Sequence, residues 1–185
     1  MKFFEEIIND SEEEQELPER GPEWEENLQT VRNMLEDKGI CYREQELPTG
    51  LHLFEFRISG QSMTVLASIC IEEDPENCQI NISYPFRAEP EFVYPLCTYL
   101  MKLSFQKRYG NFKYDEHDGE IYCQYTLPIA YGLHEDVLDN VFLTMLSSIF
   151  TCYDDIRRYA AGRYRRQVRD EIICNAQTLI IELSA

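Results

Sequence analysis

Hydrophobic residues recur with helical spacing in three stretches of the chain. The first runs from about Glu23 to Lys38, entered through Pro22 and left through Gly39. The second spans roughly Glu91 to Lys107, and the third runs from near His134 toward Gly162. Each stretch repeats apolar residues every three or four positions, so we expect three amphipathic helices that each bury one face.

Hydrophobic and polar residues alternate in the segments between these helices. The alternation predicts strands from His52 to Ile58, Met63 to Ile71 and Gln79 to Tyr84, and a hairpin from Tyr109 to Leu127 that turns at Glu116-His117-Asp118-Gly119. The order is helix, three strands, helix, two strands, helix. This order predicts an α+β fold in which an antiparallel sheet carries its helices on one side, in the sequence α-β-β-β-α-β-β-α.

The second face of the predicted sheet is mixed in character. Its polar residues are Glu55, Arg57, Thr64, Ser68, Gln79, Asn81 and Ser83, and its apolar residues include Leu53, Leu66 and Cys70. One interpretation is an ordinary solvated face with scattered apolar side chains. The other is a surface that receives a segment of another protein, for which Leu53, Leu66 and Tyr122 are the candidate contacts.

Charge is spread unevenly along the 185 residues. The net charge is −17, and residues 1–26 hold eleven acids against Lys2 and Arg20. We therefore expect an acidic leader over residues 1–21, one α+β domain over 22–162, and an extension over 163–185. A surface this acidic repels phosphate and anionic lipid, which argues against nucleic acid or a membrane as the main partner.

The segment Arg157 to Arg169 holds six arginines and no acid. Arg158, Arg165 and Arg169 share a face if the helix continues through Gly162. Three interpretations of these arginines are open. They are a solvated surface balanced by neighbouring acids, a contact surface for the acidic leader, or a contact surface for an acidic partner. Farther on, Glu171 to Leu183 predicts an apolar C-terminal helix that packs on its own domain or on a second subunit.

Catalytic and metal-binding patterns are sparse. His52, His117 and His134 have no catalytic partner near them in sequence, and the acids around His117 are explained by turn chemistry as well as by an acid/base or cation site. The seven cysteines occur singly, without zinc-ligand spacing, which favours buried thiols in a reducing cytoplasm. We predict no enzyme activity, no metal and no cofactor.

Export and membrane insertion are also disfavoured by the pattern. The N-terminus places carboxylates where a signal peptide needs a basic start and an apolar core. The most apolar run, Val137 to Phe150, is interrupted by polar residues and is shorter than the about 20 residues that span a bilayer. We expect a cytoplasmic protein.

The stretch from Trp24 to Gly162 resembles the YbjN family of bacterial proteins. The likeness is carried by the opening helix with Leu28, Val31 and Leu35, by the strand set, and by the second helix running into Tyr109-Gly110-Asn111-Phe112. It continues through the hairpin from Tyr114-Asp115 to Asp118-Gly119-Glu120-Ile121 and into the long third helix.

The resemblance implies a fold similar to type III secretion chaperones, which are small acidic dimeric proteins that hold segments of other proteins. By this resemblance the chain is a non-enzymatic, chaperone-like or regulatory binding module and a homodimer, with a polypeptide as its partner. The alternatives are a constitutive scaffolding subunit of a fixed complex and, less favoured, an unrecognised enzyme. The acidic leader and the basic extension depart from the family pattern.

Overall fold

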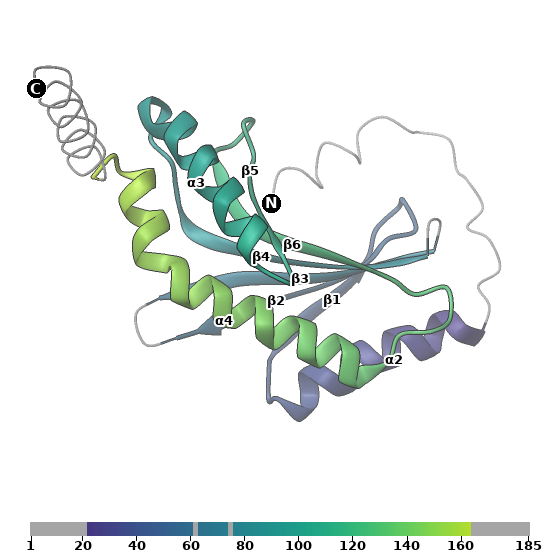
Figure 1. Cartoon of the computed structure of the whole chain (residues 1–185). Coiled ribbons are helices and arrows are strands. Elements are labelled where there is room, and N and C mark those ends of the chain that lie inside the picture. The colour runs from purple at the N-terminus through teal and green to yellow at the C-terminus, as the bar shows by residue number, and fades with distance from the viewer. Residues whose placement is uncertain (1–21, 61–62, 74–75, 164–185) are drawn as a thin grey trace, which may run out of the picture.

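The computed structural model describes residues 22–60, 63–73 and 76–163 (Figure 1). Three α-helices, one 3-10 turn and six strands make up this part of the chain. In order they are α2 (Pro22–Asp37), β1 (Tyr42–Glu46), β2 (His52–Ser59), β3 (Thr64–Glu72), β4 (Asn77–Arg87), η2 (Pro90–Phe92), α3 (Val93–Gln106), β5 (Asn111–Tyr114), β6 (Glu120–Pro128) and α4 (Glu135–Ala160).

The six strands form one antiparallel sheet in the order β1-β2-β3-β4-β6-β5. The first four strands follow each other as a meander. Helix α3 then carries the chain past β4, so that the β5-β6 hairpin returns with β6 against β4 and β5 at the edge. The predicted α+β class, antiparallel sheet and three helices are confirmed.

One face of the sheet is covered by the helices. In Figure 1, α4 runs along the sheet between α2 and α3, and it contacts both. The rings of Phe56 on β2 and Phe142 on α4 meet edge to face at 5.8 Å, and the Tyr84 hydroxyl on β4 donates to the Ile149 carbonyl at 2.9 Å. The alternating apolar residues therefore form one continuous core between sheet and helices.

The predicted order lacked strand β1. Its sequence, YREQE, offers only Tyr42 as an apolar residue, so hydrophobic alternation does not reveal it. Glu44, at its centre, lies on the helix side of the sheet and pairs there with Arg32 of α2 and His52 of β2. The observed order is thus α-β-β-β-β-α-β-β-α, and β1 is held by its pairing with β2, by the packing of Tyr42 on Phe54 and by these ion pairs.

Other predicted boundaries hold to within a few residues. Helix α3 begins at Val93, after the 3-10 turn, instead of at Glu91. Helix α4 begins after His134, whose carbonyl accepts the first N–H groups of the helix, and ends at Ala160. The acidic leader and, beyond Arg163, the C-terminal extension with its predicted helix lie outside the described residues.

Candidate functional site

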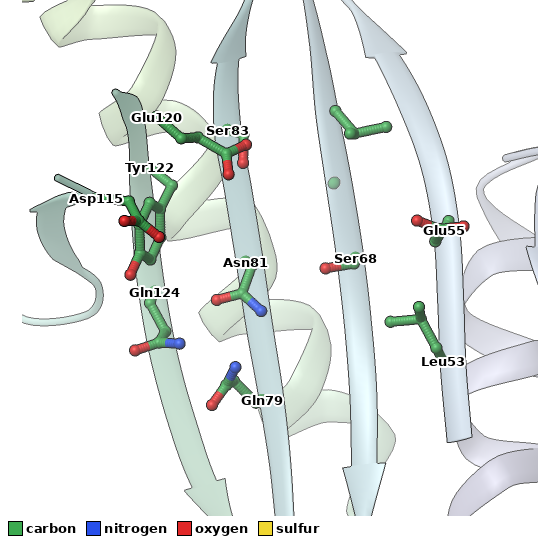
Figure 2. A pocket seen from close by; sticks show the side chains of 12 residues that line it. Leu53, Glu55, Ser68, Gln79, Asn81, Ser83, Asp115, Glu120, Tyr122 and Gln124 are labelled. Atoms are coloured by element: carbon green, nitrogen blue, oxygen red, sulfur yellow. The ribbon is translucent and has the colours of Figure 1, made fainter. Parts of the chain in front are cut away.

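The face of the sheet opposite the helices carries side chains in cross-strand rows. Leu66 pairs with Ser83 and Ser83 with Tyr122, which places these three residues in one row across β3, β4 and β6. The neighbouring row holds Glu55, Ser68, Asn81 and Gln124. Figure 2 labels Glu55, Ser68, Asn81, Ser83, Tyr122 and Gln124 on their strands, with the helices behind the sheet. We call this surface the open face.

A hollow of about 80 Å³ lies on the open face and combines apolar, amide, hydroxyl and carboxylate groups. The residues that line it are Leu53, Glu55, Leu66, Ala67, Ser68, Gln79, Asn81, Ser83, Asp115, Glu120, Tyr122 and Gln124. Three of these side chains are carboxylates and none is a cation. Pockets that hold drug-sized ligands measure roughly 300–1,000 Å³. The hollow therefore fits a single side chain better than a cofactor.

One corner of the hollow is formed by the β5-β6 turn. Figure 2 shows the Asp115 carboxylate beside the ring of Tyr122, whereas the Glu120 side chain extends toward Ser83. The pKa of Tyr122 is raised because the phenol is partly buried and because Asp115, Glu120 and Asp118 lie nearby. The phenol of Tyr122 is therefore neutral near neutral pH and can donate a hydrogen bond.

The turn itself is built by its acids, as turn chemistry predicts. Asp115 Oδ1 accepts the N–H of His117 at 2.8 Å, and Asp118 Oδ1 accepts the N–H of Glu120 at 2.9 Å. Burial opposes ionisation of Asp118, but the hydrogen bond from Glu120 and the guanidinium of Arg87, 2.9 Å away, lower the pKa of its carboxyl group. These contacts account for the Glu116-His117-Asp118-Gly119 sequence without an acid/base function.

Asn81 lies in the middle of the open face. Its side-chain oxygen Oδ1 is inaccessible to water and has no hydrogen-bond partner within the described part of the chain. Figure 2 shows that oxygen on the β6 side of the residue, toward Gln124. Buried polar groups are normally paired, and leaving one unpaired costs about 1–3 kcal/mol. Asn81 therefore marks a position where a hydrogen-bond donor would be stabilised.

The predicted contact residues fall into two groups. Leu53, Leu66 and Tyr122 come together at the hollow, where Leu53 is almost entirely buried and the other two are half-buried. Arg158 lies on the helix side of the sheet, exposed on α4 and 3.3 Å from Asp155. Arg165 and Arg169 lie outside the described residues.

Sequence reasoning did not place Asp115 and Glu120 at this site. The sequence pattern predicts only that both belong to the hairpin and its turn. The alternation of β6 puts Glu120 on the same face as Tyr122, and that signal was available in the sequence. Asp115 lies just beyond β5, and only the fold of the turn brings it against Tyr122.

The thiols and the acidic groups do not form a reactive centre in this part of the chain. Cys70, Cys78, Cys123 and Cys152 are buried, Cys97 is partly buried and Cys41 is exposed. Burial raises the pKa of Cys70 and of Cys123 to about 12, which keeps both as neutral thiols. Among the described residues, no group of three or more histidine, cysteine or acidic side chains is arranged to hold a metal ion.

Helix α3 presents a second surface feature. Tyr94, Met101 and Phe105 are 84%, 73% and 94% exposed, and together with Thr98 they form one stripe along the outer side of the helix. The opposite side of α3 buries Leu96, Leu100 and Leu103 in the core. We call the outer residues the α3 stripe. The helix is therefore apolar on two sides, which is unusual for a helix at a solvated surface.

The fold and the site define an α+β protein with helices on one face of an antiparallel sheet and a hollow on the other. Among solved structures, the chain is similar to the crystal structure of YbjN from E. coli, with a TM-score of 0.50 and 13% identity over 69% of this chain and 92% of the other. The predicted likeness to YbjN is thus confirmed at the level of the fold.

A second similar structure is the ExsC-ExsE complex. Its TM-score is 0.48, with 10% identity over 71% of this chain and 93% of the matched chain. No family model matches the sequence, and no curated protein matches it. Within the described residues, no helix is long and apolar enough to cross a membrane.

Proposed function

We propose that this protein binds polypeptide segments on its open face and acts by binding, not by catalysis. The observation that supports this proposal is the hollow, which places Leu66 and Tyr122 among hydrogen-bonding side chains on an otherwise accessible sheet face. Apolar contact provides affinity, and the surrounding polar groups orient the bound chain. The mode of action is chaperone-like or regulatory capture in the cytoplasm.

Photo-crosslinking tests this function directly. A photoreactive benzoylphenylalanine at position 66 reports on the open face, and the same group at Leu143, a 46% exposed residue on α4, serves as the matched control. We expect crosslinks to a defined set of polypeptides from position 66 and none of that set from position 143. Equal crosslinking from both positions would contradict the proposal.

We also propose that two copies of the protein associate through the α3 stripe to form a homodimer. Tyr94, Thr98, Met101 and Phe105 are spaced 4, 3 and 4 residues apart, which is the seam of a coiled coil. α3 contains no acidic residue, whereas α2 and α4 each contain several. Two copies of a chain with a net charge of −17 repel each other least where carboxylates are absent.

The second candidate is a constitutive subunit of a fixed complex, and the same stripe favours it. In that case the stripe is covered permanently by a different protein. The two readings differ in solution. A homodimer buries the stripe in the purified protein, whereas an orphaned subunit leaves it exposed and aggregates as its concentration rises.

A further inference from the structure

We propose that residues 172–183 pack as a helix on the α3 stripe of their own subunit, antiparallel to α3, and so withhold the stripe from a second copy. This inference rests on the proposed homodimer and names what regulates it. Three observations support it: the spacing of apolar residues, the place where the described chain ends, and the distribution of charge.

The α3 stripe and residues 172–183 share one spacing of residues. The stripe repeats at intervals of 4, 3 and 4 residues, through Tyr94, Thr98, Met101 and Phe105. The same intervals separate four residues of the C-terminal segment, which are Ile172, Ala176, Leu179 and Leu183. Intervals of this kind form the seam of a coiled coil. The two seams are equally long, so each can cover the other from end to end.

An antiparallel register also matches the sizes of the facing side chains. With Leu183 opposite Tyr94, the small Ala176 faces Met101. In the next layer, Leu179 faces the small Thr98. Large side chains opposite small ones fill the space between two helices without voids. The register therefore gives a packed interface over the whole stripe.

The last described turn of α4 lies beside the start of α3 (Figure 1). The N–H of Glu89, just before η2, donates to the Ala160 carbonyl at 3.1 Å. One turn earlier on α4, the ring of Tyr159 stacks on that of Tyr99 of α3, with the ring centroids 4.1 Å apart. The chain therefore leaves the described domain next to the stripe.

The chain between Arg163 and the segment is long enough for the antiparallel arrangement. Residue 172 follows Arg163 by nine positions, which span at most about 30 Å. The stripe from Tyr94 to Phe105 measures about 17 Å along the helix axis. The segment can therefore start at the far end of α3 and run back along it.

Charge favours the antiparallel direction. α3 contains no acid, and Lys107 and Arg108 directly follow its last turn. Asp170 and Glu171 directly precede the segment, and residues 170–185 contain no lysine or arginine. The antiparallel arrangement brings these two acids to the end of α3 where the two cations lie, whereas a parallel arrangement would leave them at the opposite end.

The segment and a second copy cannot occupy the stripe together. A segment tethered in the same chain acts at an effective concentration of about 1 mM. It therefore holds the stripe in dilute protein, and the homodimer forms only where the second copy outcompetes it. The C-terminal segment thus sets the concentration at which the protein dimerises.

Photo-crosslinking of the full-length protein tests the contact and its direction. Benzoylphenylalanine replaces Tyr94 in one variant and Phe105 in another, and mass spectrometry locates the crosslinks in dilute protein. We expect crosslinks near residue 183 from position 94 and near residue 172 from position 105, in products of monomer size on a denaturing gel. The control position, 143 on α4, should not crosslink to residues 172–183.

The dimer dissociation constant tests the competition. Leu179→Ser with Leu183→Ser removes two apolar contacts of the segment and should lower the dissociation constant about tenfold, because the stripe loses its competitor. Gln177→Ser with Thr178→Ser changes the opposite side of the segment and should leave the constant unchanged. Sedimentation velocity over a range of concentrations measures both.

Four outcomes would overturn the inference. They are crosslinks only to α3 of a second copy, crosslinks in the reverse order, an unchanged dissociation constant in the Leu179→Ser, Leu183→Ser variant, and a raised one, which would place the segment in the dimer interface. The homodimer can fail separately. If this variant stays monomeric at every concentration while residues 172–183 crosslink within one chain, the homodimer is wrong and the packing of the segment stands.

Discussion

Arg32 on helix α2 and Glu44 on strand β1 form an ion pair in which Arg32 Nη2 lies 2.7 Å from Glu44 Oε1. The same glutamate oxygen lies 2.7 Å from Nε2 of His52 on β2. Both side chains of the Arg32–Glu44 pair are about three-quarters buried. The pair therefore joins the edge of the sheet to the first helix at a place where the strand has little apolar surface to bury.

Loss of this pair should destabilise the fold in a pH-dependent way. The hydrogen bond from Arg32, with a smaller one from His52, lowers the pKa of Glu44 below its ordinary 4.5 even though burial opposes ionisation. The folded state therefore binds this proton less readily than the unfolded state. The stability that Glu44 contributes is fully present above pH 4.5 and is lost as the pH falls through the lowered pKa.

Urea unfolding across pH 3 to 7 measures this effect. We expect Glu44→Gln to cost about 2 kcal/mol at pH 7 and to flatten the fall in stability below pH 4.5. Glu25→Gln is the control, because Glu25 contacts the same arginine but its side chain is 66% exposed. If the two variants lose the same free energy of unfolding at pH 7, the buried ion pair stabilises the fold no more than the exposed contact does.

Two asparagines should respond oppositely to the same substitution. Asn27 Oδ1 accepts the N–H of Leu133 at 2.7 Å in a buried contact between α2 and the segment before α4. Asn27→Leu leaves that N–H unpaired and should cost about 2 kcal/mol, whereas Asn81→Leu removes an oxygen that lacks a partner and should be neutral or stabilising by about 1 kcal/mol. Chemical denaturation gives the free energy of unfolding of both variants. Equal destabilisation of the two variants would contradict the prediction.

The α3 stripe should control self-association. We expect Met101→Ser with Phe105→Ser to convert a dimer into a folded monomer, raising the dissociation constant at least 100-fold, because two large side chains per subunit leave an apolar interface. Sedimentation velocity over a range of concentrations gives the measurement. Leu143→Ser on α4 is the control and should leave the dissociation constant unchanged. If the α3 variant also keeps its dissociation constant, the dimer interface does not include the α3 stripe.

The end of α4 should be sensitive to a single methyl group. Gly162 has a φ of +66°, and a Cβ there would overlap the ring of Phe92. Gly39 has a similar φ of +63° but no atom within 4 Å of its Cβ position. Gly39→Ala should therefore cost about 1 kcal/mol from backbone strain alone, and Gly162→Ala more, because Phe92 must also move. Thermal unfolding of both variants tests this order.

Most of the secondary structure could be predicted because its signal is local. Val31 and Leu35 follow the helical period on α2, and Phe54 and Phe56 follow the strand period on β2; all four are buried as that pattern predicts. The α+β class follows from the order of these elements. Strand β1 was not predicted because Glu44, at its centre, pairs with Arg32, twelve residues earlier in the chain. An ion pair of this kind produces no alternation of apolar and polar residues in the sequence.

The candidate site was predictable only in part. Alternation placed Leu53 and Leu66 on the face away from the core, but it did not show that Leu53 is nearly buried there or that a hollow lies beside it. Nor did it show that the β5-β6 turn folds Asp115 against Tyr122.

The sequence by itself determined most of the helices and strands, all but strand β1, and which side of each is apolar, because the burial period repeats over a few consecutive residues. The tertiary structure decided the strand order, the ion pairs of Glu44 on β1 with Arg32 and His52, and the set of residues that line the hollow. Such features bring together residues that lie far apart along the chain, as Ser83 and Tyr122 do across β4 and β6. Their distances and burial arise only when the whole sheet has assembled.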